Sequence, residues 1–215
     1  MMQYVSLKEC VYDYISEKIN DGSLKPYDKI NEQQISDALN VSRTPVREAL
    51  IQMAADGYLE NMPRKGFRVK PLDHDRACNL YEVIGILDGR IAYKAVDLIN
   101  DEHIKQMQYF ADAMDAAIEQ GLSSEYYKHQ INFHEVYTNL YKNEVMTSTL
   151  NKMKNQFMRK YYKFDDLESE LKILKRTNME HHKIVALFKE KKKDELERYI
   201  RDVHWSTENA MFDSF

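Results

Sequence analysis

The fold is decided by residues 41–50, which read Val41-Ser42-Arg43-Thr44-Pro45-Val46-Arg47-Glu48-Ala49-Leu50. Thr44 suits a helix N-cap, and Pro45 suits the first helical position, where the missing N–H of proline costs nothing. The apolar residues that follow predict a helix that ends at Gly57. Arg43 and Arg47 place two guanidinium groups beside the start of this helix, an arrangement that meets phosphates and guanine edges when a helix enters a major groove.

Segments on both sides of this helix complete a motif. Upstream, Asn31 is a candidate N-cap for a short helix, and Asn40 suits the left-handed position of a tight turn. Downstream, residues 58–61 and 66–69 predict two short strands around a basic turn at 63–66. Two helices joined by a tight turn and followed by a hairpin with a basic tip predict a winged helix-turn-helix.

The run from Leu7 to Lys70, with its VSRTPVREAL and PRKGFRV segments, resembles the winged helix-turn-helix domain of the GntR family of bacterial transcription regulators. This resemblance implies a homodimer that binds palindromic double-stranded operator DNA, commonly as a repressor. In the fatty-acid-regulator branch of the family an arginine commonly follows the glutamate of the short helix, whereas this chain has Gln33, which changes the expected operator preference. The residues expected at the DNA are Gln33, Ser42, Arg43, Thr44, Pro45, Arg47, Arg64, Lys65 and Gly66.

The composition is that of an ordinary globular protein, with 215 residues of which 43% are hydrophobic and 31% charged. No apolar run reaches the length of a membrane span, and the first residues lack a signal-peptide pattern, so we expect a cytoplasmic protein without a membrane partner. Cys10 and Cys78 form no close pair, which argues against a disulfide framework or a thiolate metal cluster. Residues 1–72 carry 10 basic and 10 acidic side chains, so the net charge of −4 belongs to the remainder, with 31 − 10 = 21 basic against 35 − 10 = 25 acidic side chains. That second part is not a nucleic-acid surface by charge.

The positions of the prolines divide the chain. All four lie within the first 71 residues, so long uninterrupted helices are expected after them. We expect a DNA-binding domain at 1–70, a linker at 71–73 and an all-helical domain at 74–215. The fold class is therefore mainly α, with a small hairpin wing and an antiparallel bundle of six helices predicted at 74–99, 101–120, 123–142, 144–164, 167–191 and 193–213.

Three histidines in the second part are candidates for a metal site. His182 and His204 are equidistant from residue 193, the predicted corner between the last two helices, so they would lie side by side in an antiparallel hairpin. His134 lies on the predicted inward face of another helix. Three inward imidazoles favour a divalent metal such as Zn, Ni or Mn, with separately hydrogen-bonded core histidines as the alternative. We expect the other four to be surface or packing residues: His74, His103, His129 and His181.

The second part also resembles the FCD ligand-binding domain of the same branch, in its shorter, VanR-like form. This resemblance implies dimerisation and a small-molecule effector, commonly a carboxylic acid, at or near a metal held by an aspartate and three histidines. The aspartate should lie four residues before His134, where this chain has Gln130, a neutral ligand that weakens metal binding but strengthens the attraction for an anion. Ile84 stands where many members carry an arginine for the effector. Candidate effector-binding residues are Tyr127, Asn143 and Arg159.

Two other functions stay open at this point. The bundle could belong to a metal-free regulator that responds to a neutral ligand or a protein partner, with structural histidines. It could also be a metal-dependent enzyme. Because no carboxylate, lysine or nucleophile is placed by spacing to act as a general base, we expect no enzyme.

Overall fold

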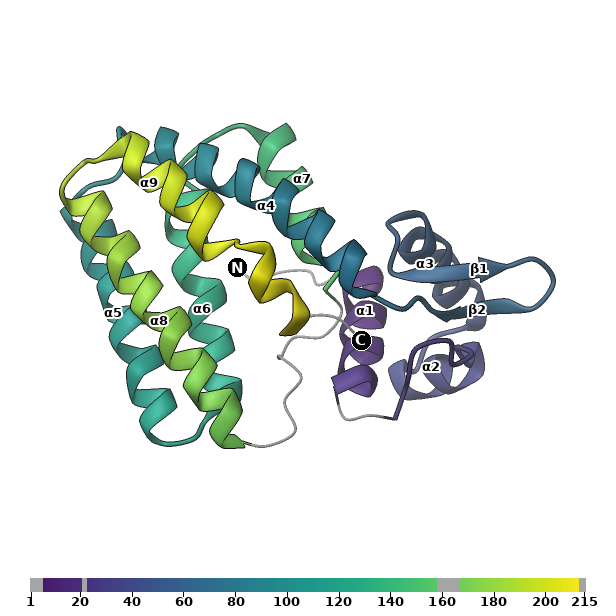
Figure 1. Ribbon diagram of the computed structural model, residues 1–215. Coiled ribbons are helices and arrows are strands. Elements are labelled where there is room, and N and C mark those ends of the chain that lie inside the picture. Colours follow the sequence, from purple (N-terminus) through teal and green to yellow (C-terminus); the bar gives the residue numbers. More distant parts are fainter. Residues whose placement is uncertain (1–5, 21–22, 158–166, 213–215) are drawn as a thin grey trace. The chain divides into compact units, whose positions relative to one another are not determined.

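The computed structural model describes residues 6–20, 23–157 and 167–212, and the chain forms two compact units (Figure 1). The first unit contains the chain up to Leu72 and a short segment that begins at Asn155. The second contains the chain from Asp73 to Lys154 and most of the later residues. Within the described residues, no helix is long and apolar enough to cross a membrane.

The first unit is a winged helix-turn-helix, as predicted. Its elements are α1 (Leu7–Asn20), α2 (Glu32–Leu39), α3 (Arg43–Ala55), β1 (Leu59–Met62) and β2 (Gly66–Val69). The two strands pair antiparallel, with Leu59 opposite Val69 and Met62 opposite Gly66. Apolar side chains of all three helices and both strands form one core, which includes Val11, Ile15, Ile35, Val46, Leu50, Met53, Phe67 and Val69.

Two asparagines define the turn between α2 and the helix that follows it. The side-chain oxygen of Asn31 caps α2 by accepting hydrogen bonds from the backbone N–H groups of Gln33 (3.0 Å) and Gln34 (3.2 Å). Asn40 ends α2 in the left-handed conformation, with φ 52° and ψ 45°. Only glycine and asparagine adopt this conformation routinely, so the sequence permits a tight turn here.

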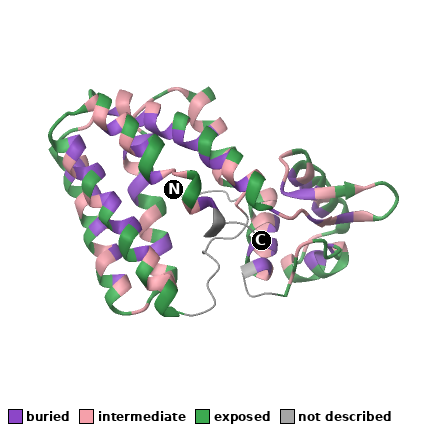
Figure 2. Ribbon diagram, in the orientation of Figure 1, coloured by how far each residue is buried: buried purple, intermediate pink, exposed green. Residues whose placement is uncertain are grey.

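The second unit is an all-helical bundle. Its helices are α4 (His74–Ala95), α5 (Asp101–Glu119), α6 (Ser123–Thr138), α7 (Glu144–Lys154), α8 (Leu167–Lys189) and α9 (Lys193–Tyr199). Helix α5 packs against both α6 and α8, and α4 packs against α7 and α9 (Figure 1). Buried residues follow one face of each long helix, and these faces are turned toward neighbouring helices (Figure 2).

Two of the predicted helices were wrong in extent. Helix α7 ends at Lys154 rather than at 164, and residues 158–166 lie outside the described part of the chain. The last predicted helix, 193–213, is instead α9 followed by a π-helix, η1 (Ile200–His204), and a 3₁₀-helix, η2 (Thr207–Phe212). Because a π turn takes one residue more than an α turn, η1 shifts the side chains after it by one position around the helix axis.

Two glycines let α4 approach this C-terminal segment closely. A Cβ atom at Gly85 would lie 2.9 Å from the carbonyl oxygen of Arg201 and 3.1 Å from the Cβ of Trp205. A Cβ at Gly89 would lie 2.8 Å from the carbonyl oxygen of Glu197. These contacts involve backbone atoms that a side chain cannot displace cheaply, so Gly85 fixes the position of η1 against α4, and Gly89 fixes that of α9.

We therefore predict that Gly85→Ala lowers the free energy of unfolding by about 1–3 kcal/mol, because the added methyl group forces α4 and η1 apart. Chemical denaturation followed by circular dichroism measures this loss. The neighbouring control Ile86→Ala, at a side chain that is 52% exposed, should change stability by less than about 0.5 kcal/mol. Equal stabilities for the two variants would contradict the close packing of α4 on η1.

Candidate nucleic-acid interface and metal centre

A basic groove lies between the helix-turn-helix and the wing. Its volume is about 550 Å³, and its lining includes side chains from α2, α3 and the turn between the strands. Four of the lining residues are basic residues that the sequence analysis predicted at the DNA: Arg43, Arg47, Arg64 and Lys65. The predicted Gly66 also lines the groove. A concave surface of this charge suits a phosphate backbone.

Helix α3 begins two residues earlier than predicted. Ser42, not Thr44, is its N-cap residue, and Arg43 is its first helical residue, so Pro45 is the third. Proline still fits this position, because none of the first N–H groups of a helix has an intrahelical partner. Both Ser42 and Thr44 are exposed at the start of the helix.

Glu32 organises the two arginines of α3. Its Oε1 atom lies 2.9 Å from Nη1 of Arg47, and its Oε2 atom lies 4.0 Å from Nη2 of Arg43. The glutamate is largely buried, whereas the arginines keep most of their side chains in solvent. Glu32 therefore holds both guanidinium groups at the groove in the absence of DNA. Sequence reasoning missed this residue, since its partners are far from it along the chain.

The tip of the wing presents the predicted basic pair. Arg64 has a φ of 63° and Gly66 a φ of 89°, so the turn between the strands uses the left-handed region twice. The N–H group of Lys65 donates to the carbonyl of Met62 (3.0 Å) and closes the turn. Arg64 and Lys65 are both exposed.

The lining of the groove differs from the predicted set of DNA-contacting residues at two positions, Lys29 and Gln33. Lys29, which the sequence analysis did not select, lines the groove, and its backbone forms a bridge with Arg68 of β2. Gln33 is exposed on α2, where its Nε2 donates to Asp37 (2.7 Å). It is Glu32, and not its neighbour Gln33, that lines the groove.

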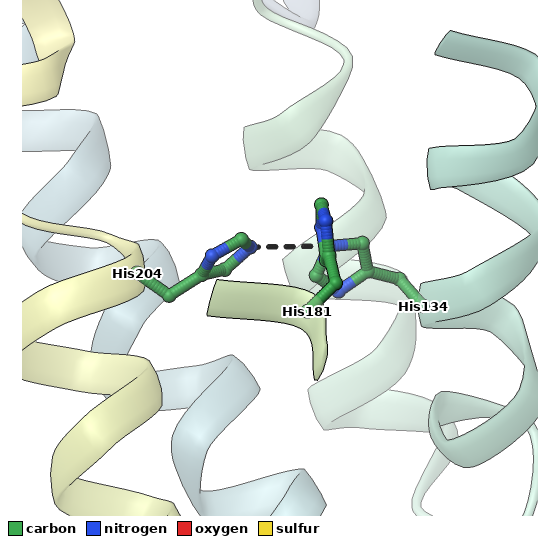
Figure 3. Close-up of side chains that lie close together, drawn as sticks. All are labelled: His134, His181 and His204. Atoms are coloured by element: carbon green, nitrogen blue, oxygen red, sulfur yellow. Dashed lines mark hydrogen bonds between the residues drawn. The ribbon is translucent and has the colours of Figure 1, made fainter. Parts of the chain in front are cut away.

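In the bundle, three buried histidines from three elements converge (Figure 3). His134 comes from α6, His181 from α8 and His204 from η1, and one ring nitrogen of each lies within 4.8 Å of the others. The Nε2 atoms of His134 and His204 are 3.2 Å apart. The three residues are 7%, 0% and 6% exposed, respectively, which removes water as a partner for most of their polar atoms.

The other ring nitrogens fix the orientation of these imidazoles. Nδ1 of His204 donates to Glu180 (2.9 Å). Nδ1 of His134 donates to the hydroxyl oxygen of Tyr137 (2.8 Å), because that hydroxyl in turn donates to Asp88 (2.8 Å). With both Nδ1 atoms protonated, each ring in its neutral form directs an unprotonated Nε2 atom at the other. This pattern of outer carboxylate and hydroxyl partners is the one that orients histidine ligands of metals.

The third histidine completes the arrangement. The amide nitrogen of Asn178 donates to the carbonyl of Ala111 (3.0 Å) and to Asp115 (2.6 Å), so its side-chain oxygen faces Nδ1 of His181 at 3.3 Å. Nδ1 of His181 is then the protonated nitrogen, and its buried Nε2 has no hydrogen-bond partner. Such an orphaned acceptor is costly unless a cation or proton reaches it. The donor set therefore fits a divalent metal.

The surroundings favour the neutral form of two of the three histidines. Burial lowers the pKa of His134 well below its ordinary value, and the positive charge of Lys154 lowers it further. Burial also lowers the pKa of His181, with His204 adding to the effect. Neutral imidazole is the ligand form. Burial raises the pKa of Tyr137, so its hydroxyl keeps the proton that it donates to Asp88.

The predicted pairing of His182 with His204 was wrong. His182 lies outside the cluster, where its Nε2 contacts Asp115 (2.7 Å) and its Nδ1 contacts Gln108 (3.3 Å). Its side chain is 35% exposed. His181, expected to be a surface or packing residue, is fully buried and lies in the cluster where His182 was expected. Neighbouring side chains point about 100° apart on an α-helix, and on α8 it is His181 that is buried and His182 that is partly exposed.

The remaining candidates differ in their surroundings. Gln130 is half-buried on α6, one turn before His134. Asn143 caps α7 by accepting from the N–H group of Met146 (3.1 Å), which occupies its side-chain oxygen. Tyr127 is buried, and its hydroxyl lies 3.5 Å from Glu170. Arg159 lies outside the described residues.

Two known families match this chain. Residues 7–69 match the family described as bacterial regulatory proteins, gntR family, and residues 79–204 match the FCD domain. The Nta operon transcriptional regulator of Aminobacter aminovorans is 26% identical over 176 residues, which cover 82% of this chain and 80% of the relative. The HTH-type transcriptional repressor RspR of Escherichia coli (strain K12) is 23% identical over 189 residues, which cover 87% and 81%.

Solved structures have the same fold. The structure of E. coli McbR/YncC matches with a TM-score of 0.76 at 18% identity, and the match covers 93% of this chain and 94% of that one. A putative transcriptional regulator GntR from Rhodococcus sp. RHA1 matches with a TM-score of 0.66 at 19% identity, over 96% of both chains. At these identities the likeness shows the fold alone.

The geometry predicts which histidine a metal requires. His181→Ala should weaken zinc binding by about 100-fold or more, because it removes a converging nitrogen, whereas His182→Ala should leave the affinity unchanged. Competition with a chromophoric chelator measures both constants. Loss of zinc in His182→Ala but not in His181→Ala would move the metal to the other grouping of possible ligands, formed by Asp112, Asp115 and His182.

Proposed function

The chain belongs to the GntR family of bacterial regulatory proteins and carries an FCD domain, and on this basis we propose an effector-controlled repressor. In this proposal, a cytoplasmic homodimer binds a palindromic operator through its winged helices. A small-molecule effector, a carboxylate, binds at a divalent metal held by His134, His181 and His204, and it changes the affinity for the operator. The observation that carries the effector site is the convergence of three buried imidazole rings, of which His181 has an Nε2 atom without a hydrogen-bond partner.

The groove supports the DNA-binding part of this proposal. Arg43 and Arg47 stand at the first turn of α3, where a recognition helix reads bases and holds phosphates, and Arg64 and Lys65 supply a second basic contact from the wing. A single winged helix reads only a few base pairs. Two copies related by a two-fold axis read a palindrome, which supports the homodimer.

The donor set supports a metal with room for an effector. Three neutral nitrogens leave the ion's full charge uncompensated within its first ligand shell, and a catalytic or ligand-binding zinc commonly keeps a fourth position for another group. The neutral Gln130 in place of an aspartate leaves this charge in place. A carboxylate is the anion that such a position favours. The metal-free regulator is the competing proposal, and the zinc measurement above separates the two.

Repression is supported by one relative, since the RspR protein of E. coli is described as a repressor. A repressor would cover its operator in the effector-free state. The effector would then release it by changing the relation between the two DNA-binding units of the dimer. Binding energy for this release must come from a difference in effector affinity between the DNA-bound and free states.

Selection from random double-stranded DNA tests the proposal without knowledge of the operator. The wild-type protein should enrich a palindromic sequence. On that sequence, Arg47→Ala should weaken binding by about 1–3 kcal/mol, and the dependence on salt should flatten if the arginine contacts a phosphate. Fluorescence anisotropy at several salt concentrations measures both effects.

Arg198→Ala is the matched control, since this exposed arginine lies on α9 in the other unit. It should bind the selected DNA as tightly as the wild type. Failure of the wild-type protein to enrich any sequence, or equal binding by Arg47→Ala and wild type, would refute the assignment of the groove.

A further inference from the structure

A fully buried carboxylate lies next to the histidine cluster. Asp88 of α4 is 0% exposed, and three donors from three other segments reach it. They are the hydroxyl of Tyr137 at 2.8 Å, the indole N–H of Trp205 at 2.9 Å and the ammonium group of Lys154 at 3.0 Å. Through Tyr137, Asp88 is also linked to His134. The carboxylate is therefore connected to a proposed metal ligand.

Lys154 is the cation of this network. It is the last residue of α7, its side chain is 23% exposed, and its ammonium group lies 5.2 Å from the centre of the Trp205 ring. Its charge is near enough to the histidines to lower the pKa of His134 and, to a smaller extent, that of His181. The lysine thus has contact with both solvent and the buried site.

The formal charges near the metal site sum to a net positive charge only when Lys154 is included. A divalent ion would contribute +2 and Lys154 +1, whereas Asp88 and Glu180 contribute −1 each, which leaves +1 as the formal sum. The same sum without Lys154 is zero. Because Coulomb interactions are strong where water is excluded, this difference decides whether an anion is attracted.

Many members of the family carry an effector-binding arginine on the helix that corresponds to α4, but this chain has no cation at that position. That position is Ile84, a fully buried apolar side chain. A cation that assists the metal in binding an anionic effector would therefore come from another helix. Among the described residues, Lys154 is the lysine or arginine that contacts the buried network around Asp88.

We propose that Lys154 is the effector-binding cation of this protein: it pairs with Asp88 in the effector-free state and with a carboxylate when one binds at the metal. The proposal rests on the proposed function of the histidine cluster and deepens it. When Lys154 moves to the effector, Asp88 keeps the donors Tyr137 and Trp205, so the buried carboxylate is not left without partners. The exchange therefore replaces one charge-assisted hydrogen bond with another of similar kind.

A cobalt spectrum provides the test. The full-length protein is loaded with Co²⁺, whose visible absorption responds to a change of ligands, and is then titrated with acetate as the probe anion. Lys154→Met should weaken acetate binding by about tenfold, and Lys154→Arg should restore most of it. The matched control Lys152→Met, at an exposed lysine on the same helix, should equal the wild type.

Asp88→Asn should change the acetate affinity in the opposite direction to Lys154→Met. Removal of the carboxylate frees Lys154 from its competing partner, so acetate should bind more tightly than to the wild type. This gain should disappear in the double variant with Lys154→Met. A merely structural role for the Asp88–Lys154 pair would weaken binding in both single variants, and the Asp88→Asn comparison remains decisive even if Lys154→Met fails to fold.

Two results would overturn the proposal while leaving the metal site intact. One is equal acetate affinity in the wild type and in folded, cobalt-loaded Lys154→Met. The other is a cobalt spectrum of the wild type that does not respond to acetate. Absence of cobalt binding in the wild type would instead refute the histidine site itself, and the proposal for Lys154 would fall with it.

Discussion

The bundle is organised around three buried imidazole rings whose nitrogens face one another. Glu180 accepts a hydrogen bond from Nδ1 of His204, and the hydroxyl of Tyr137, which donates to Asp88, accepts one from Nδ1 of His134. In the neutral rings the Nε2 atoms, 3.2 Å apart, then meet as two acceptors. Neutral acceptors at this distance in a dry interior repel each other. The surrounding hydrogen bonds thus favour a cation or a proton among the three rings, and they do so through partners that lie outside the cluster.

The backbone geometry that holds this cluster comes from small residues and an irregular helix. Gly85 and Gly89 allow α4 to contact the backbone of α9 and η1, which fixes where these two elements lie along α4. The π turn of η1 then rotates His204 toward α6 and α8. Single π turns occur often at functional sites, where they aim a side chain that a regular helix would direct elsewhere.

Much of the fold could be predicted because its signals are local. Asn31 and Asn40 mark the limits of α2, and the turn residues of the wing lie between two short apolar strands. The start of α3 was misplaced by two residues, since proline fits anywhere in the first turn. His181 could not be selected, because the spacing argument placed the corner at residue 193, whereas α8 ends at Lys189 and α9 begins at Lys193. Glu32 and Asp88 were also hidden, as their partners are distant in sequence.

The ligand set of the bound ion tests the central claim most directly. X-ray absorption by the zinc-loaded, full-length protein should show three imidazole nitrogens at about 2.0–2.1 Å, together with one further light atom. That result would establish the site of His134, His181 and His204. A single imidazole with two carboxylate oxygens would place the metal at Asp112, Asp115 and His182 and would contradict the account, as would failure of the protein to retain zinc.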